Sequence, residues 1–416
     1  FDFSRNSAAT RVNAQGLVEN VQILSSNLVQ NGDFSEEGVQ EVSNGSFSQE
    51  GVQLVTNGSF DTDSDWALGS GVNISDGKLN IDFVGAGNTA FQGISFTSGS
   101  TSKVIVVCSS YTSGRLDVRV GSNTVSSIID GVGTYTFYIK EGGYPYINFF
   151  TGIGFNGSIE SVSVREVGQD WDTFGTIDAN NTVSFANNEL TLRNDGSGSG
   201  VKQNALTIGK TYKVVVNVTD IVGNGFKVDM GNLQNITTIG TKTFYLTATT
   251  ASLLLYRNST SPQAVNGASI TNISVKEVGQ NWDILNDVTS FSFNNGIANI
   301  QGTANSANNG IKQASISAVI GKTYKISATL RSNDGGLYRF RLLDGSYFDL
   351  GNGNSTEFET ITSYHTATST AFTIFATSWY TSGTSNFDIS NISIIEISTD
   401  TNLPRINYEG FSYQDA

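Results

Sequence analysis

The chain has 416 residues, a net charge of −14 and only 14% charged residues, well below the roughly 25% of an average soluble protein. Such an acidic chain lacks the clustered Lys and Arg that phosphate contacts need, which argues against a nucleic acid partner. It contains 45 Gly but only 3 Pro and 1 Met. This profile predicts many short β-strands joined by tight polar turns, since long helices need Ala, Leu, Glu, Lys and Arg.

Neither a membrane span nor a disulfide is expected. No run approaches the roughly 18 apolar residues of a spanning helix, so we expect no membrane insertion. The single Cys108 excludes an internal disulfide, and its strand-like context KVIVVCSS predicts a buried structural thiol. No signal peptide is visible, and the chain begins at Phe1 without a Met, so we expect that an N-terminal portion precedes it.

Residues 1–28 contain two β-like stretches around the turn Asn13-Ala14-Gln15-Gly16, which favours a hairpin. This segment is too short to form a core of its own and must pack on another part of the chain. We predict that it pairs with the C-terminal segment, residues 398–416, which contains NLPRINYEGF from Asn402 to Phe411.

These two terminal stretches resemble a module of tailed-phage and prophage structural proteins. In that family a TRVN-x-x-GL-[IV]-E stretch leads closely into N-[VL]-PR-[IL]-[ND]-Y. Here some 380 residues separate the halves, as if an array had been inserted, and the chain stops at Ala416, where we expect a further domain to follow. The matching residues are Thr10, Arg11, Val12, Asn13, Gly16, Leu17, Val18, Glu19, Asn402, Pro404, Arg405, Ile406, Asn407 and Tyr408.

The resemblance implies a protein of the virion surface, with other virion proteins as partners and no catalysis. A homotrimer is one assembly that the terminal module would support.

Residues 29–53 carry short 13-residue repeats that read VQNGDFSEEGVQE and VSNGSFSQEGVQL, followed by VTNGSF. Asn-Gly is a strong turn signal, and the Phe two residues later begins or anchors a strand. We expect a duplicated opening turn that forms extra β-hairpins or an extended arm. The alternative is a stalk or a clasp between subunits. The residues that recur every 13 positions are Asn31, Asn44 and Asn57, and Phe34, Phe47 and Phe60.

A longer repeat divides the rest of the chain. SVSVREVGQDW at Ser161–Trp171 returns as NISVKEVGQNW at Asn272–Trp282, and a weaker echo, NISIIEIS, starts at Asn391. Alternating apolar and polar residues predict a strand with one buried face, which closes one domain and leads directly into the next. We therefore predict three β-sandwiches at residues 54–167, 168–278 and 279–397. Because almost no linker separates them, we expect a short and stiff array. Trp66, Trp171 and Trp282 recur near the unit starts and are assigned to packing.

About eight short strands per unit predict an all-β fold of antiparallel jelly-roll sandwiches. The units resemble carbohydrate-binding modules of the galactose-binding-like jelly-roll superfamily, whose pattern is NG-x-F, W, dGkL-x-[IV], a GktY strand and a closing [IV]-x-[NS]-[VI]-S-V. Within this chain DGKLNIDF, GKTYKVVV and NISVKEV match parts of it. The resemblance covers about 340 residues and is specific for the fold rather than for a function.

Sugar recognition needs aromatic rings that stack on pyranoses and polar groups that reach the hydroxyls. The alternative for every candidate ring is packing in a core or stiffening of a loop. The carbohydrate-binding candidates are Tyr111, Tyr144, Tyr146 and Phe149 in unit one, Tyr338, Tyr347, Trp379 and Tyr380 in unit three with Arg339, Arg341 and Asp344 nearby, and more weakly Tyr256 and Arg257 in unit two.

Modules of this family often hold a structural Ca²⁺ where the first turn meets the closing strand. The ion requires oxygen ligands, mainly carboxylates and backbone carbonyls. The matching positions are Asp61 and Glu160 in unit one. Thr271 and Ser390 stand at the closing-strand position in the other units, so no shared calcium site is expected.

Catalysis is not expected. His365 is the only His, and its context TSYHTATST predicts a surface or lightly packed side chain. HExxH, P-loop and GxSxG motifs do not occur in the sequence, and one His with one Cys cannot make a zinc site.

The first hypothesis is a phage virion surface protein, such as a fibre, an appendage or a capsid decoration. Its sandwiches would adhere to host or environmental glycans through weak contacts multiplied by copy number. The second is a glycan-binding accessory region of a secreted bacterial polysaccharide-acting protein. The third is a structural spacer without a ligand.

Overall fold

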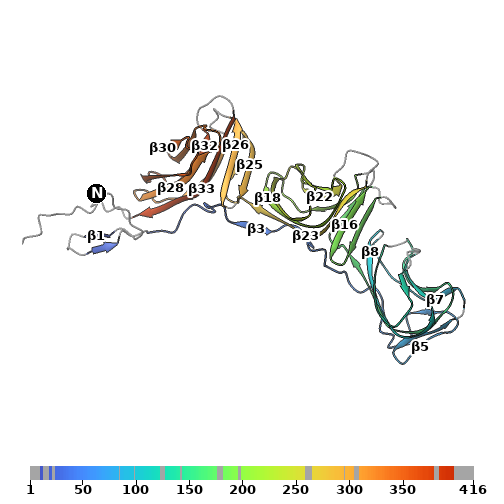
Figure 1. Ribbon diagram of the computed structural model, residues 1–416. Coiled ribbons are helices and arrows are strands. Elements are labelled where there is room, and N and C mark those ends of the chain that lie inside the picture. The colour runs from blue at the N-terminus through green and yellow to red at the C-terminus, as the bar shows by residue number, and fades with distance from the viewer. Residues whose placement is uncertain are drawn as a thin grey trace, which may run out of the picture. The chain divides into compact units, whose positions relative to one another are not determined.

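The computed structural model describes residues 10–12, 18–20, 24–83, 85–97, 99–121, 127–140, 143–175, 181–194, 198–257, 265–294, 296–303, 309–378 and 384–397. Every regular element in these ranges is a β-strand (Figure 1), which confirms the all-β prediction. Near the N-terminus, β1 (Thr10–Val12) pairs antiparallel with β2 (Val18–Asn20). The predicted counterpart, residues 398–416, lies outside the described residues.

The first sandwich consists of two five-stranded antiparallel sheets. Their strand orders are β10-β9-β12-β7-β4 and β11-β8-β13-β6-β5. Inward residues of both sheets, such as Leu79, Val104 and Phe149, share one core with Trp66 and Cys108. The strands are β4 (Ala67–Leu68), β5 (Val72–Ser75), β6 (Lys78–Phe83), β7 (Gly87–Gly93), β8 (Thr101–Gly114), β9 (Leu116–Val120), β10 (Ser127–Ile129), β11 (Gly133–Lys140), β12 (Tyr146–Thr151) and β13 (Phe155–Val167).

The second sandwich has a five-stranded sheet with the order β20-β19-β22-β17-β14 and a six-stranded sheet with the order β15-β16-β23-β18-β21, in which β3 (Glu37–Gln40) also pairs with β23. The alternating residues Tyr212, Val214, Val216 and Val218 all point into its core. The strands are β14 (Asp172–Phe174), β15 (Thr182–Ala186), β16 (Glu189–Asn194), β17 (Gly200–Asn204), β18 (Thr211–Val222), β19 (Phe226–Asp229), β20 (Leu233–Ile236), β21 (Gly240–Thr247), β22 (Ser252–Arg257) and β23 (Asn266–Val278).

The third sandwich has the orders β30-β29-β32-β27-β24 and β25-β26-β33-β28-β31. Large side chains such as Tyr324, Phe340 and Phe372 are fully buried in it. The strands are β24 (Asp283–Ile284), β25 (Val288–Asn294), β26 (Ile297–Thr303), β27 (Gly310–Ser317), β28 (Thr323–Ser332), β29 (Tyr338–Asp344), β30 (Ser346–Gly353), β31 (Glu359–Thr366), β32 (Ala371–Ser378) and β33 (Thr384–Ile397).

The three short repeats share one backbone conformation. In each, the Asn is left-handed, with φ of 46°, 47° and 49° at Asn31, Asn44 and Asn57, and the later Phe is left-handed too. The Phe N–H donates to the carbonyl of this Asn over 3.2, 3.1 and 3.2 Å in the three repeats. Asn tolerates a positive φ better than most residues, so the Asn-Gly pair builds a compact turn rather than a hairpin.

Each repeat contributes its Phe to the core of a different sandwich. The order of the repeats along the sequence is the reverse of the order of the sandwiches. Phe60 of the last repeat packs on Trp66 with ring centroids 5.5 Å apart, in the first sandwich. Phe47 packs on Trp171 at 5.6 Å, in the second sandwich. Phe34 of the first repeat packs on Trp282 at 5.3 Å, in the third sandwich. The expectation of extra hairpins or an extended arm is therefore wrong, because the turns are built into three separate cores.

Backbone contacts to the closing strands fix this assignment. The carbonyls of Gly58, Gly45 and Gly32 accept hydrogen bonds from the N–H groups of Val162, Ile273 and Ile392 at 2.7, 2.8 and 2.8 Å. A Cβ on Gly45 would lie 2.1 Å from the carbonyl oxygen of Ile273. Only glycine allows this approach, which explains why each Asn is followed by Gly.

The chain forms two compact units by its contacts, residues 1–39 with 277–416 and residues 40–276. The first unit contains the first repeat and the third sandwich, although they lie at opposite ends of the sequence. Within this unit the N–H of Leu24 donates to the carbonyl of Glu396 over 3.0 Å, and that of Leu28 donates to Ile394 over 2.9 Å. The described chain therefore enters and leaves the third sandwich side by side.

Candidate functional site

The candidate site lies on the outer face of one sheet of the third sandwich, over β27, β32, β29 and β30. On β29 the residues alternate, so that Tyr338, Phe340 and Leu342 enter the core while Arg341 and Leu343 point to the opposite face. The outer face holds a cavity of about 490 Å³. This volume falls within the range of about 300–1,000 Å³ for small-ligand sites. The described lining residues are Leu285, Lys312, Ala314, Arg341, Leu343, Tyr347, Thr373 and Phe375.

Arg341 is the central polar group of this cavity. Its side chain is only 9% exposed, and its Nε has no hydrogen-bond partner. The guanidinium carbon lies 4.8 Å from the ring centroid of Tyr347 and 5.9 Å from that of Phe375. The two rings are 5.7 Å apart and tilted by 58°. A buried donor without a partner costs about 1–3 kcal/mol, which a ligand oxygen would recover.

Among the described residues, no carboxylate forms an ion pair with Arg341 at contact distance. Arg339 donates from Nε and Nη2 to both oxygens of Asp349, each over 2.6 Å, so these two residues form a bidentate ion pair. Burial and the charge of Arg339 lower the pKa of Arg341, while Tyr347 and Asp349 act in the opposite direction. Lys312 lies 3.8 Å from the largely exposed carboxylate of Asp283, a surface pair of the kind that holds a side chain only weakly.

An outward aromatic ring beneath a cation recurs on the equivalent sheet of the other sandwiches. In the second, Lys227 lies 5.9 Å above the ring of Tyr256 on β22, and the Tyr256 hydroxyl donates to Asp229 over 3.0 Å. Burial, together with this carboxylate, raises the pKa of Tyr256 to about 12. In the first, Arg119 lies 3.6 Å above Phe150 on β12. The strand order β9-β12-β7 matches β19-β22-β17 and β29-β32-β27.

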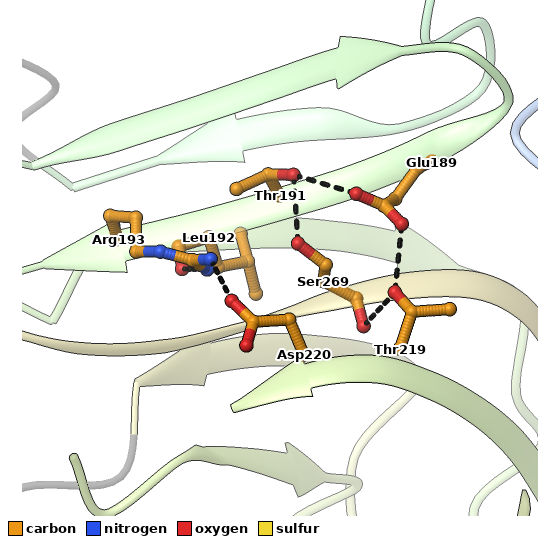
Figure 2. A network of polar contacts seen from close by, with 7 residues as sticks. All are labelled: Glu189, Thr191, Leu192, Arg193, Thr219, Asp220 and Ser269. Carbon is orange, nitrogen blue, oxygen red and sulfur yellow. Dashed lines mark hydrogen bonds and ion pairs between the residues drawn. The ribbon is translucent and has the colours of Figure 1, made fainter. Parts of the chain in front are cut away.

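The other sheet presents a different kind of surface, shown for the second sandwich in Figure 2. Thr219 donates to Glu189 over 2.7 Å, and the hydroxyls of Thr191 and Ser269 are 3.1 Å apart. Arg193 is paired with Asp220 over 2.6 Å. These polar groups satisfy one another, so a ligand would have to displace existing hydrogen bonds. The sheet face that carries Arg341 is the better candidate for a binding site.

The sequence candidates of the third sandwich have different outcomes. Tyr347 is 57% exposed and lines the cavity. Tyr338 is 0% exposed, so its ring cannot stack on a ligand, and the prediction for this residue is wrong. Its hydroxyl is buried without a partner next to Gly353. Trp379 and Tyr380 lie outside the described residues.

In the first sandwich, Tyr144 and Tyr146 stack on one another with centroids 6.1 Å apart and planes 29° apart. Tyr144 is 60% exposed, and this pair stays a sugar-binding prediction. Tyr111 instead packs on Phe155 and donates from its hydroxyl to the carbonyl of Gly114 over 3.1 Å. That arrangement favours a structural role for Tyr111. Phe149 is 0% exposed in the core of this sandwich, so the expectation that its ring could stack on a sugar is wrong.

His365 forms a pair with the buried Asp344 in the third sandwich and is itself only 12% exposed, which corrects the expectation of a surface or lightly packed His365. The His365 Nε2 lies 2.7 Å from Oδ2 of Asp344, whose side chain is fully buried. The His365 ring packs between Phe348 and Phe372. Burial by itself would raise the pKa of Asp344, but hydrogen bonds from Ser369, His365 and Thr368 outweigh it and hold the pKa well below its ordinary value.

The calcium prediction at Asp61 and Glu160 stays a prediction. Both side chains are exposed, and the Asp61 carboxylate accepts a hydrogen bond from the Ser59 hydroxyl. Within the described ranges, no group of three or more His, Cys, Asp and Glu side chains could hold a metal ion. The part of the chain that the structure describes also contains no helix long and apolar enough to cross a membrane.

Phe375 and Lys312 were missed as site residues, and Arg341 was noted only as a neighbour of the tyrosines. The alternation in AFTIFATS indicates that Phe375 points to the outer face, since Phe372, Ile374 and Ala376 are buried residues of β32. Nothing in the sequence pairs Phe375 with Arg341, because that contact depends on the register between β32 and β29.

No protein-family model matches the chain, and no curated protein matches it. Among solved structures, a CBM4 carbohydrate-binding module is similar with a TM-score of 0.25 and 13% identity, over 28% of this chain and 95% of its own. A tandem pair of CBM22 modules from Paenibacillus barcinonensis has a TM-score of 0.23 and 14% identity, over 55% and 94%. A triple jelly-roll protein of an archaeal virus turret has a TM-score of 0.21 and 11% identity, over 80% and 89%. The assignment of this chain to all-β sandwiches rests on its own strand pairing.

Proposed function

We propose that the chain is a non-catalytic glycan-adhesion protein of a virion surface. The observation that carries the adhesive role is the cavity of the third sandwich, where the exposed ring of Tyr347 and the ring of Phe375 flank an unsatisfied Arg341. Aromatic rings offer flat apolar surfaces to the C–H faces of a pyranose, and guanidinium donors reach its oxygens. The described lining contains no carboxylate, Cys or His, which fits binding rather than hydrolysis.

The virion context is supported by the terminal motif pair and by the course of the chain. Leu24 and Glu396 are hydrogen-bonded neighbours, so the chain between them begins and ends at one place, as an inserted segment would. Such an insertion fits between the two halves of a terminal module like that of tailed-phage structural proteins. Many copies on one particle would turn weak single contacts into firm attachment. A glycan-binding region of a secreted protein and a ligand-free spacer are the alternatives.

The test is a broad glycan array probed with the purified chain and with matched tyrosine variants. Tyr347→Ala should reduce binding about tenfold, since aromatic contacts at such sites contribute on the order of 1 kcal/mol or more. Tyr364→Ala is the control, because Tyr364 is 64% exposed and lies on β31 of the other sheet of the same sandwich. If no glycan binds above background, the adhesive role fails and the spacer alternative stands.

A further inference from the structure

The charge of the third-sandwich cavity is opposite to that of the chain. The protein contains 37 Asp and Glu against 23 Lys and Arg. The described residues that line the cavity include Arg341 and Lys312 but no acidic side chain. In a chain with such an excess of carboxylates, this cationic lining favours an anionic ligand over a neutral or cationic one.

The second cavity of about 490 Å³ provides an internal comparison. It lies between the first and second sandwiches, within one compact unit. Its lining carries Glu166, Asp170 and Asp172 beside a single Lys202. Carboxylates of this kind repel an anion, so the two cavities differ in charge while they match in size.

Arg341 also has the geometry for an acid group. A guanidinium presents planar donors that match a carboxylate or a sulfate through two parallel hydrogen bonds. At Arg339 this pairing is already taken by Asp349. At Arg341 the same kind of group is nine-tenths buried, has an Nε without a partner and borders the cavity.

We propose that this cavity takes a sugar that bears a negative charge, a uronate carboxylate or a sulfate, with its ring against Tyr347 and Phe375 and its acid group on Arg341. This proposal rests on the proposed glycan-binding function and names its ligand class. The rings and Leu343 give the cavity an apolar floor beside the cation. A pyranose with an acid substituent matches both features, whereas an acidic peptide side chain would use only the guanidinium.

The experiment compares polymers that differ only in charge. Polygalacturonate is tested against fully methyl-esterified polygalacturonate, and dextran sulfate against dextran, by affinity electrophoresis and calorimetry. The charged member of at least one pair should bind, the neutral member should bind at least about tenfold more weakly, and added salt should weaken the charged complex. The pair that binds identifies a carboxylate or a sulfate as the acid group.

Arg341→Gln should reduce binding of the charged polymer at least about tenfold, and Arg341→Lys should restore part of it, since a lysine keeps the charge without the planar fork. Lys322→Gln is the matched control, because it removes one positive charge from the same sandwich at an exposed side chain paired with Glu396 over 3.5 Å. Its affinity should equal that of the unaltered chain. Hydrogen–deuterium exchange of β29 and β32 establishes that each variant is folded.

Three results would overturn the proposal. One is equal binding of a charged polymer and its neutral form, with Arg341→Gln silent and Tyr347→Ala weakened, which leaves glycan binding intact. A second is binding of poly-glutamate as tight as that of the charged polysaccharide and equally dependent on Arg341, which identifies an acidic peptide site. A third is the absence of binding by any glycan, in which case the proposed function fails as well.

Discussion

The indole Nε1–H of Trp282 donates a hydrogen bond of 3.0 Å to the backbone carbonyl of Asn31, across 251 residues of chain. The equivalent bond of the second sandwich, from Trp171 to Asn44, spans 127 residues. In the first sandwich, the bond from Trp66 to Asn57 spans only 9. The same contact between turn and indole therefore closes three loops of very different length. Along the sequence, the loop of the third sandwich contains the second sandwich, and the loop of the second contains the first.

This nesting predicts that one substitution made in three equivalent repeats will loosen three different sandwiches. Phe34→Ala should destabilise the third sandwich, Phe47→Ala the second and Phe60→Ala the first, because each ring is at most 4% exposed in the core it enters. Truncation of a buried Phe costs about 3–5 kcal/mol. Hydrogen–deuterium exchange mass spectrometry of the closing strands β33, β23 and β13 provides the measurement.

The three variants serve as controls for one another. Faster exchange in β13 for Phe34→Ala, the repeat closest to the N-terminus, would contradict the nested order. So would equal loosening of all three closing strands by any single variant.

The labelling rate of Cys108 provides an independent measure of how often the first sandwich opens. Its thiol is 1% exposed, and burial raises its pKa, so a thiol reagent should react only when this sandwich opens. Phe60→Ala should accelerate the labelling of Cys108 at least about tenfold, in proportion to the greater open population. Phe34→Ala should leave the labelling rate unchanged. A rate insensitive to Phe60→Ala would show that the thiol is reached without opening of the core.

The buried carboxylate of Asp344, paired with His365, predicts acid sensitivity of the third sandwich. A carboxylate whose pKa is lower in the folded than in the unfolded chain stabilises the fold above its unfolded value of about 3.9 and loses that contribution as the pH falls below it. Asp344→Asn should therefore destabilise the third sandwich at pH 7 and flatten the fall in stability between about pH 4 and pH 2. Exchange in β29 and β31, measured against pH, checks both effects.

The control for this prediction is Asp283→Asn, which alters a largely exposed carboxylate of the same sandwich. It should change neither the stability at pH 7 nor its acid dependence. A steep acid loss that survives in Asp344→Asn would assign the sensitivity to other carboxylates.

The side chain of Gln313 holds the first repeat to the third sandwich through hydrogen bonds, and its removal should weaken this attachment. Its Oε1 accepts the N–H of Gln30 over 2.9 Å, and its Nε2 donates to the carbonyls of Gln30 and Asn281 over 2.8 and 3.1 Å. Gln313→Ala removes all three bonds and should cost about 1–3 kcal/mol. Faster exchange at residues 28–34 with unchanged exchange in β13 would confirm it. An unaffected repeat would show that Phe34 alone holds the segment.

The strands were predictable because they depend on short-range alternation. The closing strands bury the positions that their period of two indicates, such as Val162 and Val164 in β13 and Ile273 and Val275 in β23. The three Trp residues are buried as well. The same rule, applied to YRFRLLD, would have separated Tyr338 from Arg341, since Tyr338 shares its phase with Phe340 and Leu342. Residue type alone points to Tyr338, whereas its phase in the strand places it in the core.

The partners of the repeats were not predictable from their spacing. Three nearly identical turns lie 13 residues apart, and any of them could in principle close any of the sandwiches. Their assignment depends on hydrogen bonds to strands that lie from about a hundred to more than three hundred residues away, and on which carbonyl each Gly can approach.

The sequence by itself determined an all-β chain, its repeated units, its aromatic cores and the absence of a disulfide, because these properties follow from composition and local periodicity. Only the tertiary structure decided that the repeats close the sandwiches in reverse order, that His365 meets a buried carboxylate, and that Arg341 stands unpaired between Tyr347 and Phe375. Each of these features depends on the register of strands that are distant in sequence, and register is set by packing in three dimensions.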